Sequence, residues 1–403
     1  MKAVKAVFWA FLFSFALAIA DEPMVVYLTW TKDPTTTMLI QWHTPAGASS
    51  GLSYHADKEN EWKQAQGNSQ TVQGTNIEVH RIQLEGLTED REYVFKIQGS
   101  SIEYRFRTMP QKLTHPVRIA IGGDAFLGDG MAAFHRMNKV VAASHPDFVV
   151  IGGDLAYTTS GKHIVKGRKW ALSRWQTFLK ELQETLKSPE GRLVPILPVV
   201  GNHDITKPKY QTGAPEMFYE IFTFPETGKA YRSLNFGDYL SLLMLDTGHT
   251  WPIEGEQTAW LEKALKQSRG TYVFPVYHVA AYPSFYPYTD RIPEKVRKYW
   301  VSLFEKYDVP LAFEHHNHTF KRTYPIREGK VDPSGVIYLG GGSWGVPPRR
   351  PASPDQRWYL AKSKGINMVY IVTMTPDKCR VEAKNNKGFV FDVIEAQKPG
   401  FAH

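Results

Sequence analysis

Four apolar runs in this chain each end in a polar residue that binds hard metal ions. The runs cover residues 117–121, 148–151, 194–200 and 273–276, and the polar residues that follow are Asp124, Asp154, Asn202 and His278. Runs of this kind, bounded by Gly or Pro, are typical of fully buried strands. Open α/β sheets place their sites at the carboxyl edge of such strands. We therefore expect these side chains to meet at one edge.

A fifth polar segment, His315-His316-Asn317-His318, adds three imidazoles to the same set. The five segments offer carboxylate, amide, imidazole and phenol groups, and they contain no cysteine. Oxygen and nitrogen donors without a thiolate favour Fe, Mn or Zn in a reactive site over a sulfur-bound structural zinc.

The order of these blocks resembles that of the purple acid phosphatases, within the calcineurin-like metallophosphoesterases. The blocks read Gly123-Asp124, Gly153-Asp154-Leu155-Ala156-Tyr157, Gly201-Asn202-His203-Asp204, Tyr277-His278 and His315-His316-Asn317-His318. Segments 170–178, 255–261 and 321–325 also look like family features, so the resemblance extends from about residue 116 into the 380s. It implies a four-layer α/β/β/α metallophosphoesterase sandwich with metals at one edge, whose second sheet the alternating segments 367–373 and 379–383 would complete.

The resemblance also implies a dinuclear centre of Fe(III) and a divalent Zn, Mn or Fe ion, with Asp154 bridging the two. The implied iron ligands are Asp124, Asp154, Tyr157 and His318, and the implied divalent-ion ligands are Asp154, Asn202, His278 and His316. A phenol with an ordinary pKa near 10 becomes a ligand only beside a strongly charged cation, so Tyr157 favours iron. The alternative for Tyr157 is a strand-end ring that covers an apolar surface. Asp129 competes with Asp124 for its role but lies farther beyond the strand end.

The implied activity is hydrolysis of phosphate monoesters by metal-bound hydroxide, as in acid phosphatases, with Asp154 and His203 as catalytic residues. His203 would steady a phosphate oxygen or protonate the leaving group; alternatively it supports a carboxylate. Two other functions stay open. One is a phosphodiesterase on the same site, and the other is a non-catalytic exported binding or adhesion protein.

Three departures from the family pattern bear on substrate choice. Phe126 stands where the family has glycine, His315 replaces the glycine that opens the last block, and the segment after His278 lacks a downstream histidine. Candidate substrate-binding residues are His203, His315, Tyr282 and Arg349. His315 is alternatively a solvated loop residue, and Tyr282 is alternatively ordinary loop packing.

The first 110 residues have a different texture. Residues 1–20 have a basic start, an apolar run and Ala18-Ile19-Ala20, which indicates a secretory signal peptide and export to the periplasm or cell exterior. Residues 21–110 alternate apolar and polar, as in an antiparallel sandwich, and the stretch from Leu84 to Phe95 resembles a fibronectin type III module. We expect a linker at 111–116 and the catalytic domain at 117–395.

Composition limits the partners. A single cysteine, Cys379, excludes an intramolecular disulfide, and the oligomeric state stays open. Residues 21–110 carry 8 Lys/Arg against 12 Asp/Glu, whereas residues 111–403 carry 38 against 28. A basic catalytic domain favours an anionic phosphate-ester substrate, or it serves ordinary solubility. Nothing in the sequence indicates a nucleic-acid module or a transmembrane segment after signal removal.

Overall fold

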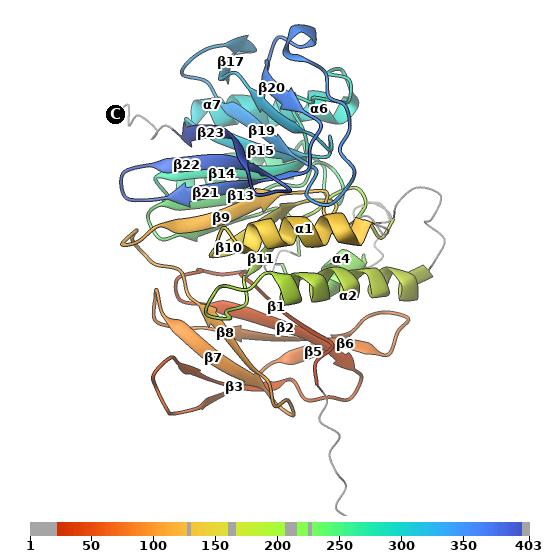
Figure 1. The fold of residues 1–403 in the computed structure, drawn as a ribbon, viewed down its shortest axis with the longest axis vertical. Helices are drawn as coiled ribbons and strands as arrows, with labels where there is room; N and C mark the ends of the chain where they lie inside the picture. Colours follow the sequence, from red (N-terminus) through yellow and green to blue (C-terminus); the bar gives the residue numbers. More distant parts are fainter. Residues whose placement is uncertain (1–21, 127–129, 160–166, 206–215, 225–227, 397–403) are drawn as a thin grey trace, which may run out of the picture.

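The computed structural model describes residues 22–126, 130–159, 167–205, 216–224 and 228–396. It contains an amino-terminal β-sandwich and a larger α/β part (Figure 1). The predicted signal peptide at 1–20 and the alternative ligand Asp129 lie outside the described residues.

The sandwich consists of two four-stranded antiparallel sheets. One sheet has the order β1-β2-β6-β5, formed by Val25–Thr29, Met38–Pro45, Ile77–Leu84 and Asn68–Thr71. The other has the order β4-β3-β7-β8, formed by Lys63–Gln66, Gly51–Ala56, Glu92–Ile97 and Glu103–Arg107. The large rings of Trp42 and Phe95 lie fully buried in one cluster between the sheets, as expected where inward and outward residues alternate along strands.

A tyrosine closes the turn before β7. The hydroxyl of Tyr93 accepts a hydrogen bond from the backbone N–H of Thr88 at 2.8 Å, which is a tyrosine corner of the kind known from β-sandwich domains. The amino-terminal domain is thus all-β, as the sequence predicts. Its assignment as a fibronectin type III module stays a prediction, as do the domain boundaries at 110 and 117.

The α/β part is built on two sheets that face each other. The six-stranded sheet has the order β11-β10-β9-β21-β22-β23, formed by Ile196–Val199, Phe148–Gly152, Val117–Gly122, Met368–Met374, Cys379–Asn385 and Val390–Ala396. The seven-stranded sheet has the order β12-β13-β14-β15-β19-β16-β20, formed by Arg232–Phe236, Leu240–Met244, Tyr272–Val279, Leu311–His315, Ile337–Gly341, Phe320–Thr323 and Leu360–Lys364. Ile121 and Val150 of one sheet share a buried cluster with Phe274 and Phe313 of the other.

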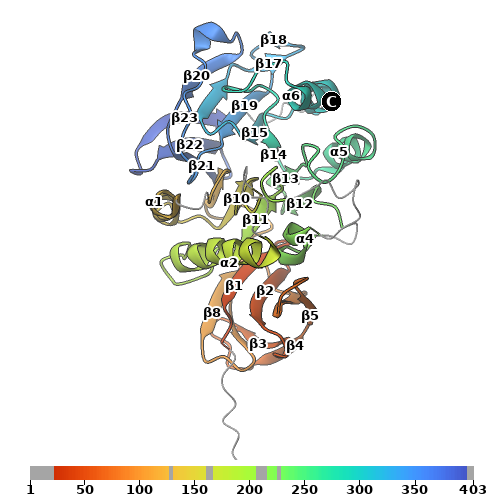
Figure 2. The same ribbon diagram turned by 90° about the vertical axis from the view of Figure 1, so that its right-hand side faces the viewer.

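Helices cover the outer face of each sheet (Figures 1 and 2). Apolar residues of α1 (Met131–Ala142) and α2 (Gly167–Thr185) pack on the six-stranded sheet. Apolar residues of α5 (Glu256–Gln267), α6 (Arg291–Val296) and α7 (Ser302–Lys306) pack on the seven-stranded sheet. A π-helical turn at Arg297–Val301 joins α6 to α7. The four-layer α/β/β/α sandwich is therefore confirmed.

The late strands occupy a different sheet from the one expected. The sequence places residues 367–373 and 379–383 in the second sheet, but β21 pairs antiparallel with β9 and so extends the first sheet, together with β22 and β23. The expectation was wrong because alternation predicts a strand but not its partner. Strand β9 pairs with β10 along one edge and with β21 along the other.

The sandwich packs against the α/β part through aromatic and polar contacts. Trp30 lies edge-on against Phe148 and Phe236, with centroids 5.7 and 5.8 Å away. Tyr27 donates its hydroxyl hydrogen to the carbonyl of Ile221, in the short helix α4 (Met217–Ile221), at 2.6 Å. Within the described ranges, no helix is both long and apolar enough to cross a membrane.

Candidate metal centre

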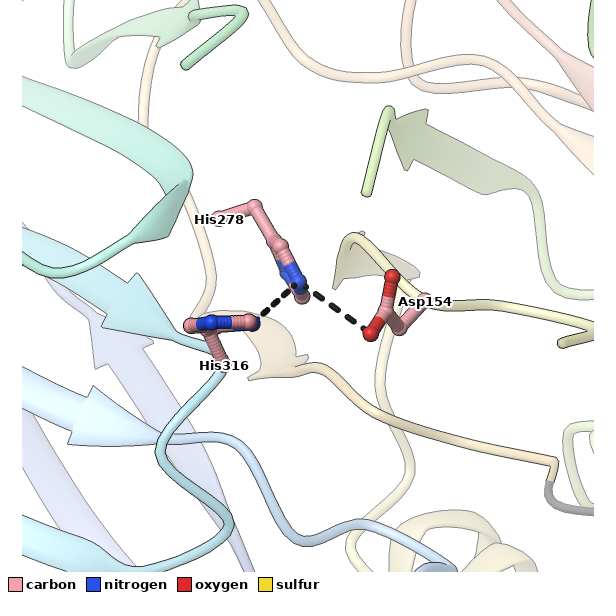
Figure 3. A group of neighbouring side chains, drawn as sticks. All are labelled: Asp154, His278 and His316. Atoms are coloured by element: carbon pink, nitrogen blue, oxygen red, sulfur yellow. Dashed lines mark hydrogen bonds and ion pairs between the residues drawn. The ribbon is translucent and has the colours of Figure 1, made fainter. Parts of the chain in front are cut away.

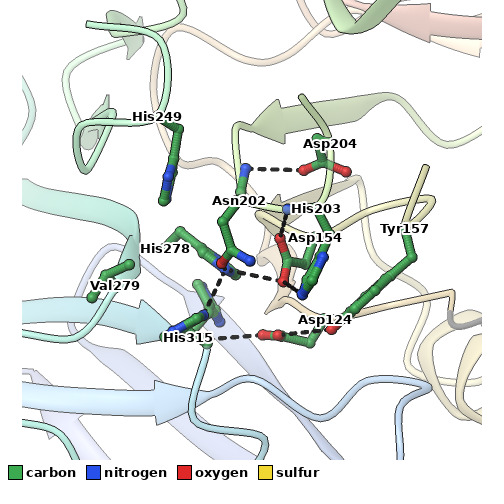
Figure 4. Close-up of polar contacts among 12 residues, drawn as sticks. Asp124, Asp154, Tyr157, Asn202, His203, Asp204, His249, His278, Val279 and His315 are labelled. Carbon is green, nitrogen blue, oxygen red and sulfur yellow. Dashed lines mark hydrogen bonds and ion pairs between the residues drawn. The ribbon is translucent and has the colours of Figure 1, made fainter. Parts of the chain in front are cut away.

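The polar segments meet at one edge of the two sheets. β9, β10 and β11 run parallel in one sheet, and β14 and β15 run parallel in the other. Their carboxyl ends carry Asp124, Asp154, Asn202, His278 and His316 to a common place (Figures 3 and 4).

Five of the seven predicted ligands have left-handed backbone conformations. Their φ angles are positive although none is glycine: Asp124 (55°), Asp154 (53°), Tyr157 (49°), His316 (68°) and His318 (55°). Positive φ is uncommon outside glycine, and such strain of order 1–3 kcal/mol per residue concentrates at functional sites. These strained backbone conformations direct the five side chains toward the common site.

One half of the centre joins Asp124, Tyr157 and His318. The Tyr157 hydroxyl lies 3.1 Å from Asp124 Oδ1 and 3.2 Å from His318 Nε2, and His318 Nε2 lies 3.0 Å from the same Asp124 oxygen. Phenol, carboxylate and imidazole therefore converge on one point. The other Asp124 oxygen accepts a hydrogen bond from the backbone N–H of His316 at 2.9 Å, which connects the two halves.

The other half joins Asp154, Asn202, His278 and His316. His278 Nε2 lies 3.3 Å from Asp154 Oδ2, 3.1 Å from Asn202 Oδ1 and 3.2 Å from His316 Nδ1. One ligand atom each from Asp154, His278 and His316 lies within 4.8 Å of the others (Figure 3). Asp154 Oδ2 is buried and accepts no hydrogen bond from the described residues. A buried carboxylate oxygen without a donor is what a cation would satisfy.

Electrostatics favour an anionic Asp154 beside a protonated His278. Burial disfavours a charge on His278, but the Asp154 carboxylate outweighs this and raises the pKa of His278 to about 9. Burial, together with the charge of His278, lowers the pKa of His316 to about 3. Burial opposes ionisation of Asp154 as well, yet His278 keeps the pKa of Asp154 well below its ordinary value. The bridge candidate is therefore an anion.

His203 lies over Tyr157. The two rings stack with centroids 4.7 Å apart, and the backbone N–H of His203 donates to Asp154 Oδ1 at 2.8 Å (Figure 4). Nδ1 lies 3.3 Å from the carbonyl of Thr159, which can only accept, so Nδ1 carries a proton. Nε2 is then free for a substrate atom, and it lies 4.0 Å from Asp154 Oδ2.

Asp204 has a supporting position that the sequence left unassigned. Its buried carboxylate accepts from the backbone N–H groups of Leu155 (2.8 Å) and Gly201 (2.9 Å), and so fastens the loops after β10 and β11 together. Burial and the charge of Asp154 raise the pKa of Asp204 to about 8. The role could have been suspected because an acid follows the Gly-Asn-His block directly.

His249 is a residue of the site that sequence reasoning missed. It follows β13, its ring lies 5.6 Å from that of His278, and its Nε2 lies 3.0 Å from Thr247 Oγ1. Burial and the nearby His278 lower the pKa of His249 well below its usual value. The available signal was the segment Asp246-Thr247-Gly248-His249 after the apolar run 242–245, which repeats the pattern of the other blocks.

A cavity of about 750 Å³ opens beside the His278 half of the centre. Its lining includes Asn202, His249, His316 and Tyr286. The Tyr286 ring stacks on His316 with centroids 4.7 Å apart. A cavity of this size has room for a small organic ligand.

The structure corrects two substrate-binding predictions. His315 is 1% exposed, and burial lowers its pKa to about 3, so it is neither a solvated residue nor a cationic phosphate ligand. Its ring fills the space against Gly123 and Gly152, where an added Cβ would lie within 3 Å of it. Strand β15 is buried along both faces, and position 315 therefore turns into the core.

Tyr282 is likewise a core residue and does not line the cavity. It is 2% exposed and packs among Tyr338, Tyr359 and Trp358. Of the two tyrosines, Tyr286 lines the cavity, whereas Tyr282 takes the alternative role of ordinary packing.

Arg349 contacts Tyr286 but does not itself line the cavity. Its guanidinium donates to the Tyr286 hydroxyl at 2.5 Å, and its backbone N–H donates to the carbonyl of His318 at 2.8 Å. Its role in binding substrate stays a prediction. The bulky Phe126 ring turns away into the core against Phe134, with centroids 5.7 Å apart, so this departure leaves the centre open.

Known protein families match both parts of the chain. Residues 23–108 match the purple acid phosphatase N-terminal domain, and residues 117–320 match the calcineurin-like phosphoesterases.

Individual relatives are distant. Purple acid phosphatase 23 of Arabidopsis thaliana is 25% identical over 372 residues, covering 82% of this chain and 78% of that protein. Probable inactive purple acid phosphatase 1 of the same plant is 22% identical, covering 79% and 58%. The solved purple acid phosphatase from yellow lupin (Lupinus luteus) seeds superposes with a TM-score of 0.72 at 17% identity, covering 92% and 73%, which shows the common fold.

Proposed function

Because this chain belongs to the calcineurin-like phosphoesterases, as a purple acid phosphatase-like member, we propose that it hydrolyses phosphate monoesters at a dinuclear metal centre. The observation that carries the proposal is the convergence of seven buried or half-buried side chains with metal-binding groups, Asp124 and Asp154 among them, at one edge of the two sheets.

The donor set fits the two implied metals. Asp124, Tyr157 and His318 would hold Fe(III), since a phenolate suits a trivalent ion. Asn202, His278 and His316 would hold a divalent Zn, Mn or Fe ion, and Asp154, whose Oδ2 accepts no hydrogen bond from the described residues, would be a ligand of both metals. When bound, such a pair polarises phosphoryl oxygens and makes water a stronger nucleophile at neutral pH.

Protein side chains would position the phosphate and transfer the proton. His203 Nε2 faces the centre while Nδ1 is held by Thr159, an arrangement that suits a group which steadies a phosphate oxygen or transfers a proton to the departing alcohol. Asp204 fixes the loop that presents His203. His278 donates its Nδ1 hydrogen to the carbonyl of Gly152 at 2.9 Å, which leaves Nε2 as the ligand atom.

The test is hydrolysis of 4-nitrophenyl phosphate and bis(4-nitrophenyl) phosphate by the full chain, before and after chelation and metal return. We expect faster hydrolysis of the monoester, loss on chelation and recovery with iron plus zinc. Asp154→Asn should abolish activity, whereas Asp377→Asn at an exposed position should not. Faster hydrolysis of the diester would instead assign a phosphodiesterase activity to the same site. The 750 Å³ cavity has room for the second ester group of such a substrate.

A non-catalytic binding protein is the second candidate. The relative named a probable inactive phosphatase and the missing histidine downstream of His278 favour it. Metal binding without hydrolysis of either ester would support this candidate. Export remains part of the proposal, and it is tested by amino-terminal sequencing of the protein recovered outside the cell, which should begin near Asp21.

A further inference from the structure

The loop between β13 and α5 holds a histidine to which the proposed reaction assigns no role. His249 lines the cavity of about 750 Å³ together with Asn202 and His316, two of the proposed ligands of the divalent ion. Its ring lies 5.6 Å from the ring of His278 and points toward that residue (Figure 4). A molecule in the cavity that reaches Asn202 and His316 can therefore also contact His249.

The hydrogen bonds of Thr247 fix which nitrogen of His249 carries the proton. The Thr247 hydroxyl accepts a hydrogen bond from the backbone N–H of Val279 at 3.2 Å, and its other partner among the described residues is His249 Nε2, at 3.0 Å. Because Thr247 is fully buried, its hydroxyl hydrogen has Nε2 as its acceptor. The ring is therefore neutral, with Nε2 as the acceptor and the proton on Nδ1.

The second nitrogen of the ring is the one that a ligand can use. His249 Nδ1 makes no hydrogen bond to the described residues and remains open to the cavity that the ring lines. It is thus an N–H donor beside Asn202 and His316. A phosphoryl oxygen is an acceptor that carries negative charge, so a hydrogen bond from this donor to such an oxygen belongs to the stronger class.

Asp246 holds this loop in place. One of its carboxylate oxygens accepts from the backbone N–H of His249 at 2.7 Å, and the other accepts from the N–H groups of Thr250 and Trp251, both at 2.8 Å. The side chain of Gln257, in α5, accepts from the backbone N–H of Asp246 at 2.8 Å and donates to its carbonyl at 2.9 Å. The donor is therefore preorganised, and a ligand does not have to order the loop.

From these contacts we propose that the Nδ1–H of His249 donates a hydrogen bond to an oxygen of the phosphoryl group bound at the divalent-ion half of the centre. His249 is then a substrate-binding residue, and Asp246 and Thr247 are its positioning residues. This inference rests on the proposed phosphatase function and adds to it a contact with the phosphoryl group.

Two amide variants separate the roles of the two ring nitrogens. The side-chain amide of Asn reaches the place of Nδ1, and that of Gln reaches the place of Nε2. His249→Asn therefore keeps a donor toward the cavity, whereas His249→Gln keeps the contact with Thr247 and loses that donor. For 4-nitrophenyl phosphate we expect kcat/KM about 10–100-fold lower in His249→Gln and within about threefold of the parent in His249→Asn.

A binding measurement needs no turnover. Calorimetric titration of the metal-loaded protein with inorganic phosphate should give a Kd about tenfold higher in His249→Gln and close to that of the parent in His249→Asn. The metal content of both variants should equal that of the parent. The control is His135→Gln, which breaks the 2.8 Å contact with Glu181 between α1 and α2, away from the cavity, and should leave the phosphate Kd unchanged.

The inference is overturned if His249→Gln does not bind phosphate more weakly than His249→Asn. The reverse order would assign His249 to support of the loop through Thr247. Loss of metal in His249→Gln would also overturn the inference, because the ring would then act through His278. If phosphate binds but no ester is hydrolysed, the proposed function fails and the phosphate Kd values alone decide the role of His249. A parent protein that binds no phosphate would contradict both.

Discussion

The ring of His203 stacks on the ring of Tyr157, with the planes 20° from parallel. Tyr157, the proposed iron ligand, thus fixes the orientation of His203, the proposed proton-transfer residue. His203 is 29% exposed, so it faces both the centre and solvent.

We predict that His203→Asn lowers kcat for 4-nitrophenyl phosphate by about 10²–10⁴-fold, the usual contribution of a positioned acid or base. The metal content of the variant should equal that of the parent, because only the backbone N–H and the ring edge of His203 approach Asp154. Steady-state kinetics with metal analysis of the same sample is the measurement. Loss of metal alongside activity would instead make His203 a support for Asp154.

We predict that the sandwich loses stability in acid because of His43. Burial, then the charges of Arg81 and His80, lower its folded pKa to about 3, from about 6.5 in the unfolded chain. The unfolded state therefore binds the proton first, and stability present above pH 6.5 falls as the pH drops toward 3, by up to about 1.4 kcal/mol per unit.

Urea unfolding at pH 7 and pH 4.5 should show a loss of about 2–3 kcal/mol from this residue, reduced in His43→Gln. His55→Gln, at a partly exposed position on the same domain, should keep the parent's pH dependence. A His43→Gln variant as acid-sensitive as the parent would assign the effect to other groups.

We predict that Lys321→Met destabilises the fold by about 3–5 kcal/mol, because it leaves the buried Glu314 carboxylate without its cation. Lys321 and Glu314 form an ion pair with almost no exposure, and Glu314 also accepts from the Tyr277 hydroxyl (2.6 Å) and the Ala281 N–H (2.7 Å). Tyr277 precedes His278 directly, so this network supports the centre. Equilibrium unfolding measures the effect.

The double variant Lys321→Met, Glu314→Gln is the control, and it should recover part of the lost stability because the buried charge is gone. No recovery would mean that Lys321 contributes through packing of its aliphatic chain.

The family resemblance implies the four layers, whereas the meeting of the polar segments can be predicted from the sequence for a physical reason. A buried parallel strand is a local apolar run, and the carboxyl ends of parallel strands share one edge, so Asp124, Asp154 and Asn202 could be placed together from the chain alone. Their roles as ligands stay a prediction.

Side-chain direction within irregular segments could not be predicted in the same way. His315 and His316 are neighbours in sequence, yet the first turns into the core, while the second has a positive φ and lines the cavity. Tyr282 and Tyr286 differ similarly, because the loop between them is shaped by Asn317, which is distant in sequence. The pairing of β21 with β9 is also a long-range choice.

The most direct test of the account is metal analysis with a visible absorption spectrum of the purified full chain and of Tyr157→Phe. We predict two metal ions per chain including iron, and a tyrosinate-to-iron charge-transfer band that disappears in Tyr157→Phe while His318 and Asp124 retain the metal. A colourless protein with one metal ion or none would contradict the dinuclear iron centre.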